Sequence, residues 1–338
     1  MLKMCALVLA VICWCPAAQG MPFDQAYWIA VSSGVVKIEV TRSEGYSLGT
    51  GVVVDSGKVV TACHVVRGAS RVAVLYAGVR YNAIAREISA RHDLCLLNTP
   101  QLEARPVMLR PTTQLAIGEE VGAIGFSAGA GIHYAHGAVE RLYRYDGSLV
   151  IQGGAAFTSG ASGGGLFDAD RRLVGILLFR MRSAGAQYFS APVEWIRDVP
   201  SGEPSETTDA VSPVEPFWNR TFDGLPWFMR ANILVSAGRW DEVPALLSLW
   251  QHDEPDSAEA AFLAGELDSE RNDTAQALID YRDAVARDPG HALAWCGLLR
   301  ASMKARMTDG ARQAYAKLVA LSPVLSGRMA NEFPEVLQ

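Results

Sequence analysis

The sequence predicts a multidomain protein in which an all-β unit is followed by an all-α array of helical repeats. Short apolar strands separated by glycine and proline occupy residues 35–200, a pattern typical of β-barrels. Pro255, Pro289 and Pro323 recur every 34 residues, a period typical of helical repeats. Between the two regions, residues 201–217 are rich in Pro, Ser, Glu, Thr and Asp. That composition predicts a linker.

The first 20 residues have the organisation of a secretory signal peptide. Lys3 precedes an apolar run from Met4 to Trp14, and small residues follow before Gly20. The apolar run is too short to cross a bilayer. We therefore expect residues 1–20 to be removed after Ala18 or Gly20, which leaves a secreted or periplasmic protein with no stable membrane span. A retained membrane anchor is the alternative.

A glycine-rich stretch surrounds Ser162. Glycines on both sides of a serine permit tight backbone dihedrals and let a substrate carbonyl approach the main chain closely. The backbone N–H groups of Gly160 and Ser162 would then form an oxyanion hole, in which each donor is worth about 2.7–4 kcal/mol. Taken alone, the stretch is more typical of a flexible loop.

Two upstream residues make the catalytic interpretation stronger. A serine hydroxyl needs a base to take its proton and a third group to orient that base. His64 ends an apolar strand, and Asp93 stands directly before another. The chain order His64, Asp93, Ser162 is the order of the chymotrypsin arrangement. These three residues are therefore the candidate catalytic residues.

The motifs resemble those of trypsin-like serine proteases of the HtrA-like bacterial type. The family's His, Asp and Ser segments are similar to GTGVVVDSGKVVTACHVV, HDLCLL and IQGGAAFTSGASGGGLFDADRRLVGI, and EEVGAIGF resembles the strand that opens its second barrel. The resemblance covers residues 33–199. It implies a trypsin-like domain over residues 21–200 with a double six-stranded barrel, His64 and Asp93 lying on the first barrel and Ser162 on the second.

The resemblance also implies a role for each candidate residue. Ser162 would be the nucleophile, His64 the general base and then acid, and Asp93 the group that fixes the imidazole tautomer. The N–H groups of Gly160 and Ser162 would hold the oxyanion. The reaction would be hydrolysis of peptide bonds through an acyl-enzyme, with no metal and no cofactor.

The sequence departs from the family pattern at four positions. Ala161 stands where Asn is usual and Gly165 where Pro is usual, and Cys63 and Cys95 replace small apolar residues. The extra glycine is expected to loosen the oxyanion loop. The two cysteines adjoin the candidate histidine and aspartate, so their side chains would lie close together. Two buried thiols are the favoured interpretation and a disulfide is the alternative; Cys296 is the remaining cysteine after signal removal.

Specificity is indicated by four residues that the resemblance places around the substrate. Ala156 would form the floor of the pocket for the residue before the scissile bond, and it has no carboxylate. Leu178, Phe179 and Arg180 would lie along the pocket wall or the substrate strand. A small or medium apolar side chain is therefore the expected preference, and a basic one is not.

Residues 218–338 resemble tetratricopeptide repeats, with copies at about 224–257, 258–291 and 292–325. The resemblance implies stacked helical hairpins with a concave groove for a peptide or protein partner. A helical bundle that serves only stability or dimerisation is the alternative. The positions that align in the three copies are Trp227, Ala261 and Trp295; Val243, Ala277 and Ala311; and Leu247, Tyr281 and Tyr315.

Charge is unevenly distributed. Residues 21–200 carry 17 Lys and Arg against 15 Asp and Glu, and residues 201–338 carry 12 against 21. Neither part has the basic excess of a nucleic-acid-binding protein, and the acidic array favours a basic or neutral ligand. His133 and His136 are expected at the surface and not as metal ligands, and His92 is expected to face solvent.

These observations predict an exported serine endopeptidase whose repeats bind a partner or substrate. The leading alternative is a catalytically inactive scaffold that acts through protein–protein interactions of its repeats. A chaperone-like factor acting on envelope proteins is a third possibility. The oligomeric state stays open.

Overall fold

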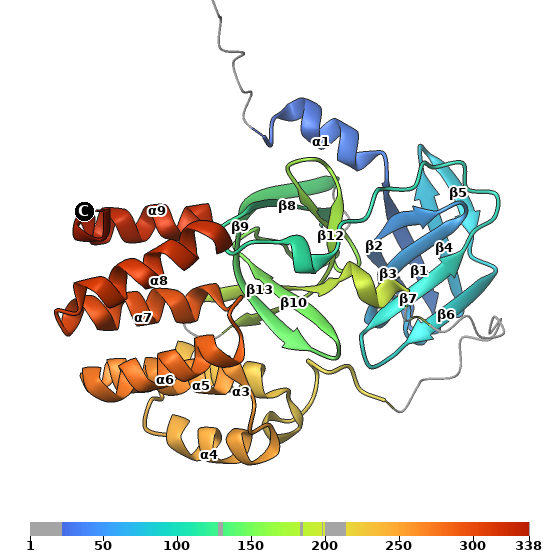
Figure 1. Cartoon of the computed structure of the whole chain (residues 1–338). Coiled ribbons are helices and arrows are strands. Elements are labelled where there is room, and N and C mark those ends of the chain that lie inside the picture. The colour runs from blue at the N-terminus through green and yellow to red at the C-terminus, as the bar shows by residue number, and fades with distance from the viewer. Residues whose placement is uncertain (1–21, 128–130, 183–184, 198, 200–213, 338) are drawn as a thin grey trace, which may run out of the picture.

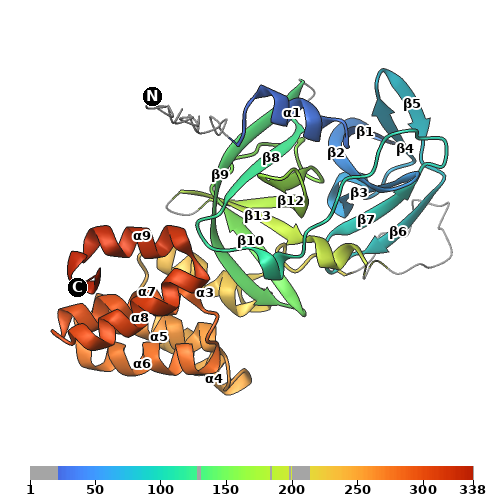
Figure 2. The same cartoon turned by 45° about the horizontal axis from the view of Figure 1, so that its top comes forward.

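The computed structural model describes residues 22–127, 131–182, 185–197, 199 and 214–337. Two β units and a helical array follow one another in space: a seven-stranded sheet at one end, a closed barrel in the middle and the array on the far side of the barrel (Figure 1). The second view keeps this arrangement (Figure 2). The predicted signal peptide and most of the predicted linker lie outside the described residues.

The first β unit is a sheet with strand order β5-β4-β1-β2-β3-β7-β6. It has one strand more than the six that we expected, because the segment after β4 is divided into two strands: β5 pairs with β4, and β6 pairs with β7. The strands are β1 (Val35–Arg42), β2 (Gly45–Asp55), β3 (Lys58–Ala62), β4 (Arg71–Tyr76), β5 (Val79–Asn82), β6 (Ala85–Ser89) and β7 (Leu94–Asn98).

The second β unit is the predicted closed barrel of six strands, in the order β10-β13-β12-β11-β8-β9. A barrel has no exposed edges, and its inward side chains form a core of aliphatic and aromatic residues. The strands are β8 (Glu120–Phe126), β9 (Ile132–Tyr145), β10 (Ser148–Gly153), β11 (Gly165–Asp168), β12 (Leu173–Arg182) and β13 (Ala186–Pro192).

An N-terminal helix covers the outside of this barrel. Helix α1 (Gln25–Ser32) begins at Asp24, whose carboxylate accepts a hydrogen bond from the N–H of Tyr27 at 2.8 Å. Trp28 stacks on Tyr134 of β9 with a centroid separation of 4.6 Å. Helix α1 therefore buries its aromatic side chains against its own barrel, over β8 and β9 (Figure 2).

His92 does not face solvent, so that prediction was wrong. Its ring stacks on Trp195 at 4.1 Å, and its Nε2 lies 2.6 Å from a carboxylate oxygen of Asp146. Trp195, in the short helix Val193–Ile196, is fully buried. Strand alternation alone predicted exposure, whereas the helix that closes the barrel covers this face.

The C-terminal part is an array of antiparallel helices, consistent with tetratricopeptide-like repeats. Tyr281 packs between two glycines: an added Cβ at Gly265 or Gly297 would come within 2.7 or 2.4 Å of its ring. Gly265 belongs to the same repeat and Gly297 to the next, so one aromatic side chain joins two repeats. The helices are α3 (Trp227–Ser236), α4 (Val243–Asp253), α5 (Ala258–Glu270), α6 (Thr274–Arg287), α7 (Ala292–Lys304), α8 (Thr308–Leu321) and α9 (Pro323–Glu332).

The array packs directly against the barrel. Phe228 of α3 stacks on Tyr143 of β9 at 4.5 Å. Arg144 pairs with Asp288 at 3.0 Å between the same two bodies. The hydrophobic core of the barrel continues into α3, α4 and α5. The array and the barrel therefore form one packed structure.

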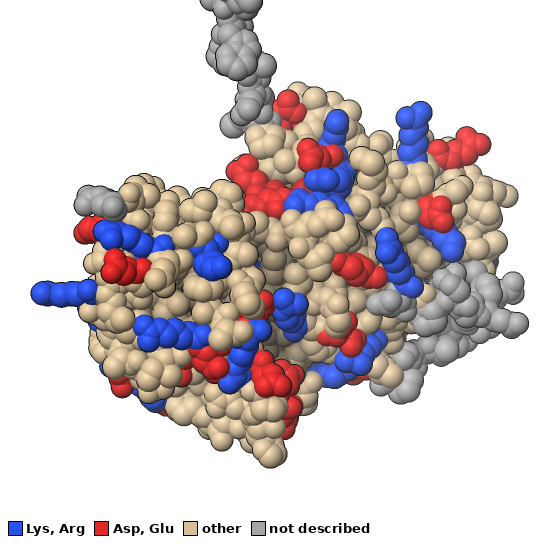
Figure 3. All heavy atoms as spheres, in the orientation of Figure 1, with Lys and Arg blue, Asp and Glu red and all other residues tan. Residues whose placement is uncertain are grey.

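Positive and negative side chains are mixed on the surface. On the face drawn in Figure 3, Lys and Arg are interspersed with Asp and Glu over both the barrel and the array.

Among the residues that the structure describes, no helix combines the length and apolarity that a bilayer crossing requires.

Candidate active site

His64 and Asp93 meet at the end of the first sheet. His64 lies on the one-turn helix α2 (Cys63–Val66), which follows β3 directly. Its Nδ1 is 2.6 Å from Oδ2 of Asp93, and its backbone N–H donates to Oδ1 at 2.8 Å. Asp93 has a φ of 59°, a left-handed conformation that Asp adopts more readily than most residues. The pairing orients the imidazole and leaves its Nε2 for other partners.

A disulfide holds these two segments together. Cys63 and Cys95 are bonded, and their Cα atoms are 4.9 Å apart. The favoured interpretation of two free thiols was therefore wrong, and the alternative holds. The bond forms because β3 and β7 are neighbours, with Thr61 opposite Cys95 in the register. Cys296 is free and buried in the array.

Ser162 lies in a compact turn between β10 and β11. The N–H of Ala161 donates to the carbonyl of Thr158 at 3.0 Å, with Gly160 at a φ of 96°. Within the described residues, the N–H groups of Gly160 and Ser162 have no hydrogen-bond partner. Two donors that lie two residues apart in one tight turn can bind a developing oxyanion.

Gly165 does not loosen this turn, contrary to expectation. It is the first residue of β11 and pairs with Ile124 and Ile176. A Cβ at Gly165 would come within 2.2 Å of the Phe167 ring, so the glycine accommodates close packing inside the barrel. The segment after Ser162 is therefore held by the pairing of β11 with β8 and β12.

Thr50 ties the Ser162 turn to the first sheet, and sequence reasoning missed it. This fully buried residue donates from Oγ1 to the carbonyl of Gly160 at 2.7 Å and from its N–H to the carbonyl of Ser162 at 3.1 Å. Its Oγ1 also accepts from the N–H of Phe126 at 2.8 Å. Thr50 thus fixes the turn on both sides of the serine; the GTG motif indicated the strand but not this role.

The Ser162 hydroxyl has a partner other than His64 in this structure. Its Oγ donates to the carbonyl of Leu178 on β12 at 3.3 Å. Among the described residues, no hydrogen bond joins it to His64. A rotation about the Cα–Cβ bond of Ser162 would release this long hydrogen bond and turn the hydroxyl in another direction.

Trp218 is a second site residue that sequence reasoning missed. Its Nε1–H donates to Oδ2 of Asp93 at 3.1 Å, and its ring lies edge-on to the His64 ring at 5.5 Å. The other face of the indole stacks on Phe179 at 5.0 Å. The neighbouring Phe217 is fully buried and its N–H donates to the carbonyl of Arg91 at 3.0 Å. No local motif marks Trp218, because it follows the linker and is far from Asp93 in the chain.

The expected specificity residues are only partly brought together. The carbonyl of Leu178 accepts a hydrogen bond from Ser162. The ring of Phe179 stacks between the rings of Phe189 and Trp218. Arg180 pairs with Tyr188 in the ladder of β12 and β13. Ala156 is half-buried in the segment between β10 and β11. Leu178 therefore lies beside Ser162, and Phe179 and Arg180 continue the same strand.

Among the described residues, no metal-ligating side chains cluster around the two histidines of β9. His133 and His136 are exposed, and the ring of His136 stacks on Phe23 at 5.8 Å. In the part of the chain that the structure describes, no group of three or more His, Cys, Asp and Glu side chains is placed to hold a metal ion.

The fold and this site define a class of protein. Residues 49–176 match the family described as trypsin-like peptidase domain. Residues 49–176 are thus similar to a trypsin-like peptidase domain, and a helical array follows them.

Two curated relatives are similar to this domain. A probable periplasmic serine endoprotease, DegP-like, of Buchnera aphidicola is 29% identical over 152 residues, which cover 42% of this chain and 33% of that protein. The chloroplastic Protease Do-like 1 of Arabidopsis thaliana is 32% identical over 163 residues, covering 44% of this chain and 37% of that protein. The chain therefore spans about a third of the length of these relatives.

Among solved structures, the HtrA-type protease AlgW with a tripeptide is 27% identical, with a TM-score of 0.47. The aligned part covers 51% of this chain and 62% of that one.

Proposed function

We propose that this protein is an exported serine endopeptidase in which Ser162, His64 and Asp93 form the catalytic triad. The observation that carries the proposal is the 2.6 Å contact between His64 Nδ1 and Asp93 Oδ2. The Ser162 turn supports it, because its Gly160 and Ser162 N–H groups have no partner among the residues that the structure describes. A base oriented by a buried carboxylate and an adjacent nucleophile are the elements of acyl transfer.

The reaction would proceed in two similar halves. Ser162 Oγ attacks the carbonyl carbon of the scissile bond while His64 Nε2 takes its proton. The carbonyl oxygen becomes an oxyanion, held by the N–H groups of Gly160 and Ser162. His64 then protonates the leaving amine, the C–N bond breaks and an acyl-enzyme remains. Water then attacks the acyl carbon while His64 takes its proton, the ester C–O bond breaks, His64 returns the proton to Ser162 Oγ and the acid is released.

Asp93 acts by holding His64 in one tautomer and by stabilising the imidazolium that forms. Its side chain is 1% exposed, compared with 31% for His64. A buried carboxylate needs donors to remain charged. Asp93 has the two N–H groups of His64 and the indole N–H of Trp218. Trp218 is therefore a positioning residue in this proposal.

Substrate preference follows from the residues beside the nucleophile. Ala156 offers no carboxylate, and the aromatic rings of Phe179 and Trp218 form an apolar wall next to His64. A small or medium apolar residue before the scissile bond is the preference that these side chains support. Cleavage of a peptide panel mainly after Lys or Arg would contradict it.

Export and partner binding complete the proposal. The Cys63–Cys95 disulfide supports an oxidising compartment, and the name of the Buchnera aphidicola relative places that protein in the periplasm. The helical array would bind a peptide or protein partner. We take the domain limits as 21–200 for the protease, 201–217 for the linker and 218–338 for the repeats.

The test is labelling and cleavage by the protein lacking residues 1–20, beside its Ser162→Ala variant. The expected result is that a fluorophosphonate probe labels Ser162 and that casein is cleaved, whereas the variant does neither. Matched circular dichroism spectra would show that the variant is folded. Labelling at another serine, or equal cleavage by both proteins, would overturn the assignment.

One observation favours the second candidate, an inactive scaffold. Ser162 Oγ donates a hydrogen bond to the Leu178 carbonyl, and among the described residues no hydrogen bond joins it to His64. A scaffold would show no labelling and no cleavage even when partner peptides are added. An enzyme with a resting state of this kind would become labelled once a substrate or partner is present.

A further inference from the structure

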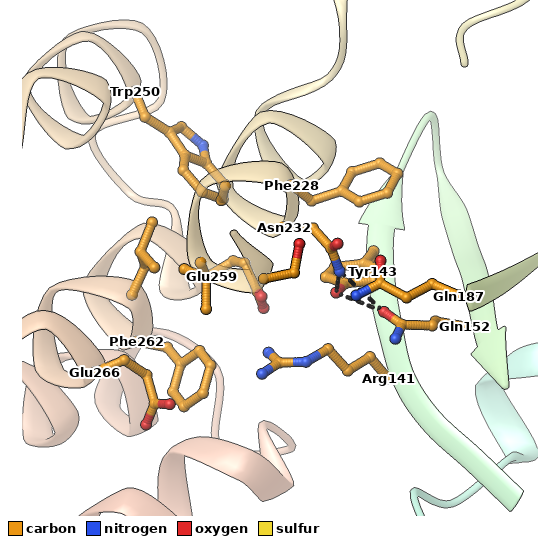
Figure 4. A pocket seen from close by; sticks show the side chains of 14 residues that line it. Arg141, Tyr143, Gln152, Gln187, Phe228, Asn232, Trp250, Glu259, Phe262 and Glu266 are labelled. Atoms are coloured by element: carbon orange, nitrogen blue, oxygen red, sulfur yellow. Dashed lines mark hydrogen bonds between the residues drawn. The ribbon is translucent and has the colours of Figure 1, made fainter. Parts of the chain in front are cut away.

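A cavity lies where the array meets the barrel, away from the serine turn. Its volume is about 240 Å³. Strands β9, β10 and β13 form one wall, and helices α3, α4 and α5 form the other (Figure 4). A molecule bound there would contact both bodies at once.

Three polar side chains in this cavity have unused hydrogen-bonding capacity. Oδ1 of Asn232 and Oε1 of Gln187 are buried and have no hydrogen-bond partner in the described part of the chain. The guanidinium of Arg141 extends into the same space (Figure 4), 5.6 Å from the centre of the Phe262 ring, and within the described residues it has no hydrogen bond or ion pair. Buried polar groups normally have partners, and leaving one unpaired costs about 1–3 kcal/mol.

The orientation of Asn232 follows from its neighbours. Its Nδ2 donates to the hydroxyl of Tyr143 at 3.0 Å and to Oε1 of Gln152 at 3.1 Å. Gln152 is fixed in turn, because its Nε2 donates to Glu140 at 3.1 Å and its Oε1 accepts from Tyr143 at 3.0 Å. A flipped Asn232 amide would place two acceptor oxygens against each other. The unpaired Oδ1 is therefore the group offered to a ligand.

Apart from Ser236 and the polar groups described above, the lining is apolar or acidic. Phe228, Trp250 and Leu263 supply aromatic and aliphatic surface on the array side. Glu259 accepts from His291 at 2.8 Å and Glu266 from the Tyr281 hydroxyl at 2.6 Å. The lining thus has two carboxylates and one guanidinium, which disfavours a ligand with a net negative charge.

These features specify a ligand chemistry. The oxygens of Asn232 and Gln187 need N–H donors, Arg141 needs a carbonyl acceptor, and the aromatic wall needs an apolar side chain. A peptide main chain supplies N–H and C=O groups side by side, and an apolar residue supplies the third element. The volume accommodates one such side chain with its adjoining peptide groups.

We propose that this cavity binds a neutral or basic peptide segment through one buried apolar side chain and its flanking peptide groups. The proposal deepens the partner binding assigned above to the array and is independent of catalysis. Because the ligand touches barrel and array, it binds the docked arrangement and stabilises it by mass action.

The test uses the full chain with Ser162→Ala, so that no probe is cleaved. The probe is the fluorescein-labelled, capped pentapeptide Ala-Gly-Leu-Lys-Ala, and binding is followed by fluorescence anisotropy. Two matched probes replace its Leu by Ser or its Lys by Asp. We expect saturable binding of the first probe and affinities at least fivefold weaker for the other two.

A pair of variants locates the binding. Arg141→Met removes the guanidinium donors in the cavity, and Arg182→Met removes an exposed arginine of β12 in the same barrel. We expect at least a tenfold loss of affinity for the first and less than a twofold loss for the second, with unchanged thermal unfolding as the check on folding. No saturable binding, or equal affinities in the two variants, would overturn the proposal. Because catalysis plays no part in this experiment, its failure is distinguishable from failure of the protease assignment.

Discussion

The indole N–H of Trp218 donates to the carboxylate of Asp93 at 3.1 Å, across 125 positions of the chain. Asp93 belongs to the first β unit, and Trp218 lies between the linker and the first helix of the array. Phe217 beside it is buried in the core shared by the β units. The region that leads into the array is therefore a structural part of the candidate active site.

The Trp218→Phe substitution tests this relationship. It keeps an aromatic ring against Phe179 and removes the N–H donor. We expect kcat/KM for a peptide substrate to fall about tenfold, because a hydrogen bond to a charged group is worth roughly 1.5–3 kcal/mol. The loss should appear in kcat and not in KM, because the aromatic ring next to His64 is retained whereas the donor to the Asp93 carboxylate is lost. Trp240→Phe, within the array, is the matched control; an unchanged kcat in both variants would exclude the positioning role.

Thr50→Val should impair the oxyanion turn without removing a catalytic atom. The substitution is nearly isosteric, but it leaves the Gly160 carbonyl and the Phe126 N–H without their hydroxyl partner. We expect about a tenfold lower kcat and a stability loss of about 1–3 kcal/mol, the usual cost of an unsatisfied buried group. Thr50→Ser retains the hydroxyl and should restore activity. Steady-state kinetics and urea unfolding measure both effects; equal activity of all three proteins would argue against this role.

Removal of the disulfide should lower stability more than it alters chemistry. Cys63 and Cys95 are 32 residues apart, and closing a loop of that length stabilises a fold by about 3–4 kcal/mol in the chain-entropy description. We expect the Cys63→Ala, Cys95→Ala double variant to unfold at a clearly lower temperature. Wild-type protein in a strong reductant should behave in the same way. Calorimetry with and without reductant checks this, and coincident unfolding curves would show that the bond contributes little.

The stability of the array should depend on the protonation of Asp280. Burial, followed by a hydrogen bond with Asp268, raises the pKa of Asp280 to about 6. Because the folded state favours the protonated form, this contribution is fully present below about pH 4 and is lost as pH rises through about 6. Asp280→Asn should therefore be more stable than wild type at pH 7, by about 1 kcal/mol after allowance for solvent screening.

The same pair of proteins provides the control for that prediction. At pH 4 the wild-type carboxyl is already neutral, so the two unfolding temperatures should converge. A stability difference that stays constant between pH 4 and pH 8 would assign the effect of the substitution to packing and not to titration.

Much of this protein could be predicted from local patterns. Most strands of the two β units are visible in the sequence, as are the candidate residues His64, Asp93 and Ser162 and the 34-residue repeats. Each of these features depends on neighbouring residues, because strand alternation, glycine-rich turns and repeat spacing are local properties. Packing of Tyr281 against Gly265 and Gly297 obeys the same logic, since each repeat contacts only the next.

Other features were decided only by the tertiary structure. The Cys63–Cys95 bond depends on the pairing of β3 with β7, and the burial of His92 depends on where Trp195 lies. The contacts of Thr50 with the serine turn and of Trp218 with Asp93 join segments that are 110 and 125 residues apart. Sequence by itself determined which elements and candidate catalytic residues this protein has. The packing of the two β units and the array decided which further residues support the candidate catalytic residues. Contacts between distant segments produce no local sequence pattern from which those residues could be predicted.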